Sequence, residues 1–223
     1  MSSPAGRGLV RIINPNSNQA VTAGMSAAVD CLRAVDGPRL DCITLSEGPL
    51  GVESLADVNL AERLLMDHVK SDTQADAFVL GCYSDPGLFG CAESTDKPVF
   101  GIQQCAALQA IARGGRFGVI SLSPVSVERH LRHLRILGLE AHCAGDRPAN
   151  LTVAESEAGE DTFDNLRAVG EQLRDADGAR SVILGCTGMA KHRVNLERAL
   201  GIPVIEPTQA ATSLAIGAVT LGW

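Results

Sequence analysis

The sequence predicts an α/β protein made of two pseudo-symmetric lobes, each a mainly parallel sheet flanked by helices, with an active site in the cleft between them. Short β-branched runs alternate with longer amphipathic segments, which is typical of βα units around a parallel sheet. Three pairs of similar segments also recur in the same order about 105 residues apart, which indicates a duplicated unit. We therefore expect a first lobe of residues 1–100 with 207–223 and a second lobe of residues 101–206.

Strands are expected where short apolar runs end at a glycine or a polar residue. Helices lie between them, and the clearest covers residues 53–71, with Leu55, Leu65 and Val69 on one side. The acidic stretch 145–165 lacks an apolar period, so we expect a solvated loop and the first turn of a helix, with a lid over the cleft as the alternative. The expected strands cover residues 9–13, 41–45, 77–81, 99–102, 116–121, 140–143, 181–185 and 203–205.

The repeat pairs two loops that each place a cysteine directly after a glycine. AFVLGCYSDPG is similar to SVILGCTGMA, which makes Cys82 and Cys186 equivalent. Equivalent loops of two pseudo-symmetric lobes meet at the cleft, so we expect these cysteines to face each other. The two other pairs are KPVFGIQQCAA with IPVIEPTQAA and RIINPNSN with GVISLSPVS.

Composition restricts the kind of ligand and the compartment. A net charge of −7 and an aromatic content of 3% argue against a nucleic-acid surface, which needs basic patches and stacking rings. The longest apolar stretch, 210–223, is too short to span a membrane, and residues 1–15 show no export signal. Seven scattered cysteines without a CxxC pair indicate free thiols rather than disulfides or a zinc ribbon. We expect a cytoplasmic protein whose partner is a small molecule.

Cys82 and Cys186 have the sequence context of acid/base residues. Each follows an apolar strand and precedes an expected helix, at the carboxyl end of a parallel strand where α/β sheets place ligands. Backbone N–H groups and the helix dipole are expected to lower the thiol pKa from about 8.5 toward neutrality. Two such thiols on opposite sides of a carbon could remove a proton from one face and return one to the other, inverting the stereocentre without a cofactor. A lone cysteine here would be interpreted as a small apolar residue.

Other chemistry-bearing residues are expected to be structural. His130 and His133 alternate with arginines, so we expect a solvated basic helix face and no metal site. Asp85 is expected to cap the helix after Cys82, with Pro86 in its first turn. Cys105 could border the cleft. Burial is otherwise the expectation for the remaining cysteines, which are Cys31, Cys42, Cys91, Cys105 and Cys143.

The chain resembles the aspartate/glutamate/hydantoin racemase superfamily, and within it the hydantoin and allantoin racemase branch. The resemblance implies two pseudo-symmetric α/β lobes, no cofactor and a two-cysteine acid/base pair, with Cys82 and Cys186 at the matching positions. It also implies that the final helix, after Glu206, packs with the first lobe. The first loop, NPNSNQAVT, departs from the usual sequence of that branch. Thr187, directly after the second cysteine, resembles the residue found there in the amino-acid racemases. Four blocks carry the resemblance: INPNSNQAVT, GCYSDPGL, GRFGVIS and LGCTGM.

The expected substrate is a 5-substituted hydantoin or allantoin. An amino-acid carboxylate would ordinarily be paired with Arg or Lys, and neither lies within the cleft motifs. Aspartate or glutamate racemisation, a decarboxylase or isomerase of the same superfamily, and a binding protein with an inactive site remain the alternatives. The apolar C-terminal segment makes a homo-oligomer plausible. The residues expected to bind substrate are neutral: Asn14, Asn16, Ser17, Tyr83, Ser84, Ser121, Ser123, Thr187 and Gly188.

Overall fold

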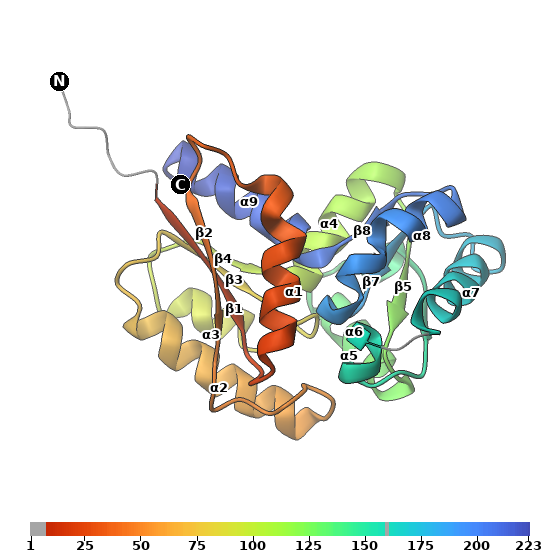
Figure 1. The fold of residues 1–223 in the computed structure, drawn as a ribbon, viewed down its shortest axis with the longest axis horizontal. Helices are drawn as coiled ribbons and strands as arrows, with labels where there is room; N and C mark the ends of the chain where they lie inside the picture. The colour runs from red at the N-terminus through yellow and green to blue at the C-terminus, as the bar shows by residue number, and fades with distance from the viewer. Residues whose placement is uncertain (1–7, 159–160) are drawn as a thin grey trace.

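The computed structural model describes residues 8–158 and 161–223 and arranges their strands in two four-stranded parallel sheets (Figure 1). The first sheet has the order β2-β1-β3-β4 and the second the matching order β6-β5-β7-β8. The predicted α/β fold with two similar sheets is confirmed. The strands are β1 (Leu9–Asn14), β2 (Arg39–Thr44), β3 (Ala77–Leu80), β4 (Val99–Gly101), β5 (Phe117–Ser121), β6 (Cys143–Pro148), β7 (Ser181–Leu184) and β8 (Val204–Ile205).

Helices cover both faces of the first sheet. Side chains alternate along β1, so Val10 and Ile12 face the core shared with α1 and α9, whereas Leu9 and Ile13 face the core shared with α2 and α3. No helix of the described residues is long and apolar enough to cross a membrane. The α-helices are α1 (Gln19–Val29), α2 (Leu55–Ser71), α3 (Leu88–Glu93), α4 (Ile102–Gly114), α5 (Pro124–Ile136), α6 (Val153–Ala158), α7 (Thr162–Asp175), α8 (Arg193–Leu200) and α9 (Pro207–Leu221), and the 3₁₀ helices are η1 (Asp30–Leu32), η2 (Glu140–His142) and η3 (Thr187–His192).

The predicted helix over residues 53–71 is confirmed as α2. Ser54 accepts a hydrogen bond from the backbone N–H of Asp57, whose carboxylate accepts one from the backbone N–H of Ser54. This reciprocal cap satisfies N–H groups that have no partner inside the helix. Ala61, Leu65 and Val69 then recur every four residues and form the buried stripe.

The two sheets are joined through α4 and α9. α9 packs against β1, β3 and β4 of the first sheet, as the resemblance implies for the final helix. α4 contacts α9 and also β7 of the second sheet (Figure 1). A single hydrophobic cluster runs from Val10 and Ile12 through Ala106 and Ala110 to Val182 and Ile183. The lobe boundaries at 100/101 and 206/207 stay a prediction.

The segment from 140 to 165 differs from the prediction. Residues 140–142 form η2, and the strand begins only at Cys143 and runs to Pro148. β6 is an outer strand whose residues are all half-buried, and its CAGDRP sequence lacks the apolar run that marked the inner strands. Residues 159–160 of the stretch 145–165 lie outside the described residues. The rest contains most of β6 and the short helix α6 where a loop was expected, and it ends in the first turn of α7, as predicted.

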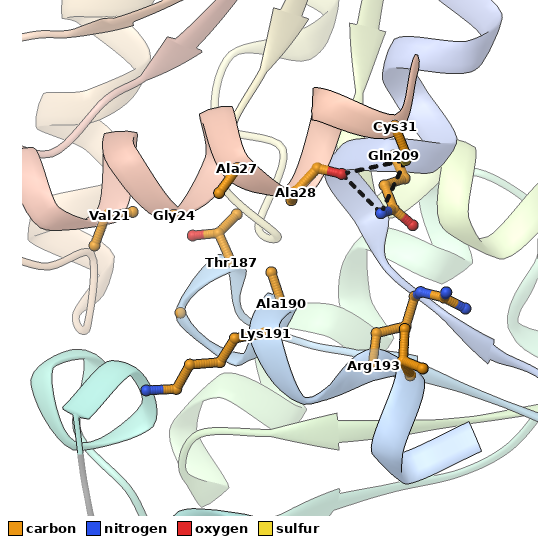
Figure 2. A pocket seen from close by; sticks show the side chains of 12 residues that line it. Val21, Gly24, Ala27, Ala28, Cys31, Thr187, Ala190, Lys191, Arg193 and Gln209 are labelled. Carbon is orange, nitrogen blue, oxygen red and sulfur yellow. Dashed lines mark hydrogen bonds between the residues drawn. The ribbon is translucent and has the colours of Figure 1, made fainter. Parts of the chain in front are cut away.

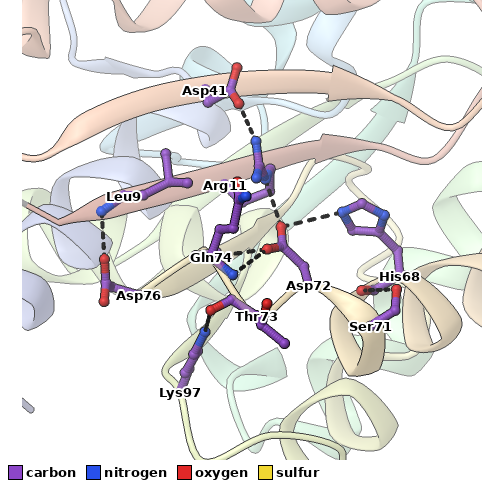
Figure 3. A network of polar contacts seen from close by, with 11 residues as sticks. Leu9, Arg11, Asp41, His68, Ser71, Asp72, Thr73, Gln74, Asp76 and Lys97 are labelled. Atoms are coloured by element: carbon purple, nitrogen blue, oxygen red, sulfur yellow. Dashed lines mark hydrogen bonds and ion pairs between the residues drawn. The ribbon is translucent and has the colours of Figure 1, made fainter.

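A buried ion-pair network ties β1 to the end of α2 (Figure 3). Arg11 Nε donates to Asp72 Oδ2 at 2.8 Å, and Arg11 Nη1 pairs with Asp41. Burial raises the pKa of Asp72, but hydrogen bonds from Arg11 and from the backbone N–H groups of Gln74 and Ala75 outweigh it and lower the pKa from 3.8 to about 2. The folded protein therefore favours the carboxylate form.

Asp72→Asn is expected to lower the free energy of unfolding at pH 7 by about 2 kcal/mol, the equivalent of the pKa shift. A carboxyl with a lowered pKa stabilises the fold above its unfolded pKa, and this contribution is lost as the pH falls from about 4 to about 2. Urea unfolding at pH 7, 5 and 3 measures the difference. The difference should shrink at pH 3, and a difference that does not depend on pH would contradict the electrostatic explanation. Asp67→Asn, at an exposed position on α2, is the control.

Candidate active site

Two equivalent glycines place the two cysteines at the carboxyl ends of β3 and β7. The backbone N–H of Gly81 donates to Ile13 O at 2.8 Å, and that of Gly185 donates to Ile120 O at 2.8 Å. A side chain on Gly185 would lie 2.6 Å from Ile120 O, and one on Gly81 would lie 2.8 Å from Ile13 O. The chain after each strand thus passes too close to the neighbouring strand for any residue but glycine, and the cysteine follows directly.

Both cysteines line one small cavity of about 40 Å³, as the repeat predicted for equivalent loops. Its walls come from both sheets and from α5 and α6. A water molecule occupies roughly 10–15 Å³ on this measure, so the cavity holds only a few waters. Val52 before α2 and Val153 at the start of α6 line it too.

Burial, rather than a helix dipole, has the largest effect on the pKa of the two thiols. It raises the pKa of Cys82 to about 12, although the backbone N–H of Ser84 and the charge of Arg129 act in the lowering direction. Burial also raises the pKa of Cys186, against hydrogen bonds from the backbone N–H of Gly188 and from Ser156, whose Oγ lies 3.6 Å from Cys186 Sγ.

The expected lowering of these pKa values toward neutrality was therefore wrong. α3 begins only at Leu88, so Cys82 does not lie at its N-terminus. Cys186 does directly precede η3, but its side chain is buried and the cost of burying the charge is larger than the gain. The thiol form of both cysteines predominates at neutral pH.

Labelling of Cys82 by iodoacetamide is expected to rise about tenfold per pH unit between pH 7 and 9, because only the thiolate reacts and the pKa is about 12. Peptide mass spectrometry after timed quenching measures each cysteine separately. The exposed thiol of Cys31 controls for reagent activity. A Cys82 rate that levels off below pH 8 would mean that the thiol ionises near neutrality, contrary to the burial argument.

Helix α5 supports the Cys82 loop. The ring of Tyr83 meets the ring of His130 edge-on, with centroids 4.7 Å apart and an interplanar angle of 83°. His133 Nε2 lies 3.5 Å from Asp85 Oδ2. The predicted solvated helix face was wrong for both histidines, since the side chain of His130 is 3% exposed and that of His133 is 13% exposed. Among the described residues no group of three or more His, Cys, Asp or Glu could hold a metal ion.

Asp85 caps a different helix from the one predicted. Its carboxylate accepts hydrogen bonds from the backbone N–H groups of Gln103 and Gln104 at 2.9 and 2.8 Å, in the first turn of α4. Asp85 itself has a φ of 43°, which turns the chain after Cys82, so α3 starts beyond Pro86 with Gly87 as its N-cap. The predicted capping role of Asp85 is confirmed, but the helix that it caps is α4 and not the helix after Cys82.

Four of the nine residues expected to bind substrate line the cavity: Asn16, Tyr83, Ser84 and Thr187. Asn14 lies behind it, where its Nδ2 donates to Asn16 Oδ1 at 3.0 Å and holds that side chain in place. Ser17 donates to Pro49 O at 3.3 Å. Ser123 is the N-cap of α5.

Ser121 and Gly188 are not among the residues that line the cavity, although the backbone N–H of Gly188 acts on the Cys186 thiol. Ser121 is fully buried, donates to Asp146, and lies 2.8 Å from His130 Nδ1, which is itself 3.1 Å from Asp146 Oδ2. Gly188 lines a separate pocket of about 330 Å³ between α1 and η3. In Figure 2, Thr187 lies below Ala27 at the wall of that pocket. The exposed Cys31, which was expected to be buried, lies in the same pocket.

Arg129, a basic residue in the cavity wall, was not among the predicted site residues. Its Nη1 donates to Glu53 O at 2.9 Å and its Nη2 to Ser126 Oγ at 3.2 Å. The buried positions of α5 are Ser126, His130 and Leu134, spaced four apart. Two of the three are polar, so hydrophobic periodicity did not show which side of α5 faces inward.

Comparison with known proteins finds similarity to racemases in the family models, the curated proteins and the solved structures. A family model described as Asp/Glu/Hydantoin racemase matches residues 10–215. A hydantoin racemase from Paenarthrobacter aurescens is 33% identical over 96% of this chain and 92% of its own, and one from Pseudomonas sp. (strain NS671) is 31% identical over 96% and 86%. The solved structure of an allantoin racemase from Klebsiella pneumoniae superposes with a TM-score of 0.91 at 27% identity, covering 96% of this chain and 89% of that one.

Proposed function

Because the chain belongs to the Asp/Glu/hydantoin racemase family, we propose that it racemises 5-substituted hydantoins or allantoin without a cofactor, using Cys82 and Cys186 as its acid and base. The observation that carries the proposal is the position of these two thiols, at the equivalent ends of β3 and β7 and in the wall of one cavity. The homologues named as racemases support the class of reaction, which is isomerisation.

In the proposed reaction the two thiols act on opposite faces of the substrate carbon. The thiolate of one cysteine takes the proton from C5, and the electrons move onto the neighbouring carbonyl oxygen as an enolate. The thiol of the other cysteine then gives its proton to the opposite face of C5. The two cysteines exchange roles for the other enantiomer, so one negative charge stays in the site throughout.

The apolar walls and neutral hydrogen-bonding groups of the cavity support a neutral ring as substrate, and the Arg129 guanidinium in the same wall has two nitrogens engaged by Glu53 O and Ser126 Oγ. Val52, Leu122 and Val153 supply apolar walls, while Asn16 and Thr187 supply neutral hydrogen-bonding groups suited to imide and ureide carbonyls. A neutral ring also loses its proton more easily, because no carboxylate charge opposes the carbanion. The curated relatives named hydantoin racemase agree with this choice of substrate.

A substrate panel tests the proposal. Single enantiomers of 5-benzylhydantoin, 5-isopropylhydantoin, allantoin, aspartate and glutamate are incubated with the protein and followed by chiral chromatography, with buffer rates subtracted. We expect at least one hydantoin or allantoin to racemise and both amino acids to remain unchanged. Racemisation of aspartate or glutamate alone would contradict the substrate assignment. An arylmalonate is added to the panel for the decarboxylase alternative, and carbon dioxide released from it without racemisation of any other compound would indicate a decarboxylase.

We also propose that the protein forms a homo-oligomer in the cytoplasm. Leu214 and Leu221 on α9 and Trp223 at its end are exposed large apolar side chains, which support an interface there. All seven cysteines are free, which supports a reducing compartment. Light scattering coupled to size-exclusion chromatography should give an even multiple of the chain mass, and a monomer at micromolar concentration would contradict the oligomer.

A further inference from the structure

The proposed two-base reaction requires one negative charge inside a buried cavity. An unpaired charge in such a place is costly, because the protein does not replace the water that would surround it. Both thiols of this site are subject to that cost, since burial raises the pKa of each. A cation in the cavity wall would offset it.

Arg129 is the one arginine or lysine among the described residues that line the cavity. Two of its nitrogens are tied down, since Nη1 donates to Glu53 O at 2.9 Å and Nη2 to Ser126 Oγ at 3.2 Å. Its Nε is buried and has no hydrogen-bond partner. The guanidinium is therefore held in place with a donor still available, and an anion that forms beside it gains a partner without any rearrangement.

The charge of Arg129 acts on Cys82. Burial lowers the pKa of Arg129, and a Cys82 thiolate raises it. In return, Arg129 lowers the pKa of Cys82. Cys186 has a different environment, with Ser156 and the backbone N–H of Gly188 as partners and the Glu53 carboxylate as the charge that raises its pKa. The two thiols are therefore electrostatically unequal.

Other charged groups face the same pair. The Asp85 carboxylate and Cys186 both raise the pKa of Cys82. Asp57 and Glu53 act on Arg129 in the same direction as a Cys82 thiolate. At Cys82, the positive charge of Arg129 opposes the effect of the Asp85 carboxylate on the pKa of the thiol.

We propose that Arg129 is the counter-ion of the Cys82 thiolate, a positioning residue that allows Cys82 to serve as a base. The catalytic part of this inference rests on the proposed function. The pairing of Arg129 with Cys82 is independent of it. When Cys82 takes the C5 proton it becomes neutral, and the negative charge moves to the enolate and then to Cys186 as that thiol delivers its own proton. Cys186 regains a proton and Cys82 loses one to solvent before the next turnover.

The test compares thiol labelling in four variants. Labelling of Cys82 by iodoacetamide is compared between the single variant Cys186→Ser and the double variant Cys186→Ser with Arg129→Gln. Labelling of Cys186 is compared in the same way between Cys82→Ser and Cys82→Ser with Arg129→Gln. The charge of Arg129 lowers the pKa of Cys82, so Arg129→Gln should slow labelling of Cys82 at pH 9 by more than about threefold. Labelling of Cys186 should change less than about threefold. A merely structural role would alter both cysteines alike.

Matched variants and the racemisation rate complete the test. Arg132→Gln, at an exposed position on the same helix, should leave both labelling rates unchanged, and Arg129→Lys should restore part of the Cys82 rate. Arg129→Gln should lower kcat/KM by the same factor for both enantiomers, because the enantiomers are equally stable. Unchanged Cys82 labelling in Arg129→Gln would overturn the inference. Slower Cys82 labelling in a protein whose wild type racemises no hydantoin would instead overturn the proposed function and leave the ion pair standing.

Discussion

Replacing either Cys82 or Cys186 with serine is expected to lower the racemisation rate by about 10²–10⁴-fold while leaving the fold intact, the range for loss of a general acid or base. Serine has nearly the same shape, but its hydroxyl is a far weaker acid than a thiol, and neither its proton nor its alkoxide is available near neutral pH. Because each direction of the reaction uses both groups, each single variant should affect both enantiomers.

The control for these variants is Cys31→Ser. Cys31 is exposed and lies in the separate pocket between α1 and η3, so its substitution should leave the rate unchanged. Circular dichroism and thermal unfolding of all three variants check that the fold persists. A Cys82→Ser or Cys186→Ser protein that racemises substrate at the wild-type rate would contradict the two-base mechanism.

Asp85→Ala is expected to cause a large loss of stability, about 2–4 kcal/mol, because two backbone N–H groups each lose their acceptor at a cost of about 1–3 kcal/mol. Asp85 is 3% exposed, and its carboxylate is the acceptor for the backbone N–H groups of Gln103 and Gln104. Without it these two N–H groups at the start of α4 lose their acceptor, and His133 loses its charged neighbour. α4 connects the two sheets, so the loss should affect the whole fold.

Urea unfolding measures this loss. Asp85→Asn keeps one acceptor oxygen and should lose less than Asp85→Ala. Glu62→Ala on the nearby helix α2 is exposed and should change the free energy of unfolding by less than about 0.5 kcal/mol. If Asp85→Ala lost less than about 1 kcal/mol, the backbone N–H groups of α4 would have found another acceptor and the capping role would be wrong.

The features that could be predicted from the sequence are those that local patterns determine. Inner strands such as β3 and β7 are buried on both faces, and continuous apolar runs mark them. The strand-end cysteines could be placed because each follows an apolar run that ends in glycine, and the two runs match each other in the repeat. The length of α2 followed from its apolar stripe.

Features that depend on tertiary burial could not be predicted. β6 lies at the edge of its sheet and has no apolar run, so its start was misplaced. Arg129 and His130 sit on an inward face of α5 that is polar because it meets the Cys82 loop rather than the core. The pKa of Cys82 depends on how much of the cavity is closed over it, which no spacing of residues in the sequence reveals.

The most direct measurement of the central claim is deuterium incorporation during racemisation in D₂O. A single enantiomer of the active hydantoin is converted to about one tenth, the enantiomers are separated, and proton NMR measures the C5 proton in each, with the buffer-only exchange subtracted. Two cysteines acting on opposite faces predict a product that carries deuterium at C5 and remaining substrate that keeps its proton. Equal deuterium in substrate and product from the earliest times would mean that a single base serves both faces, and would contradict the assignment of Cys82 and Cys186 as a pair.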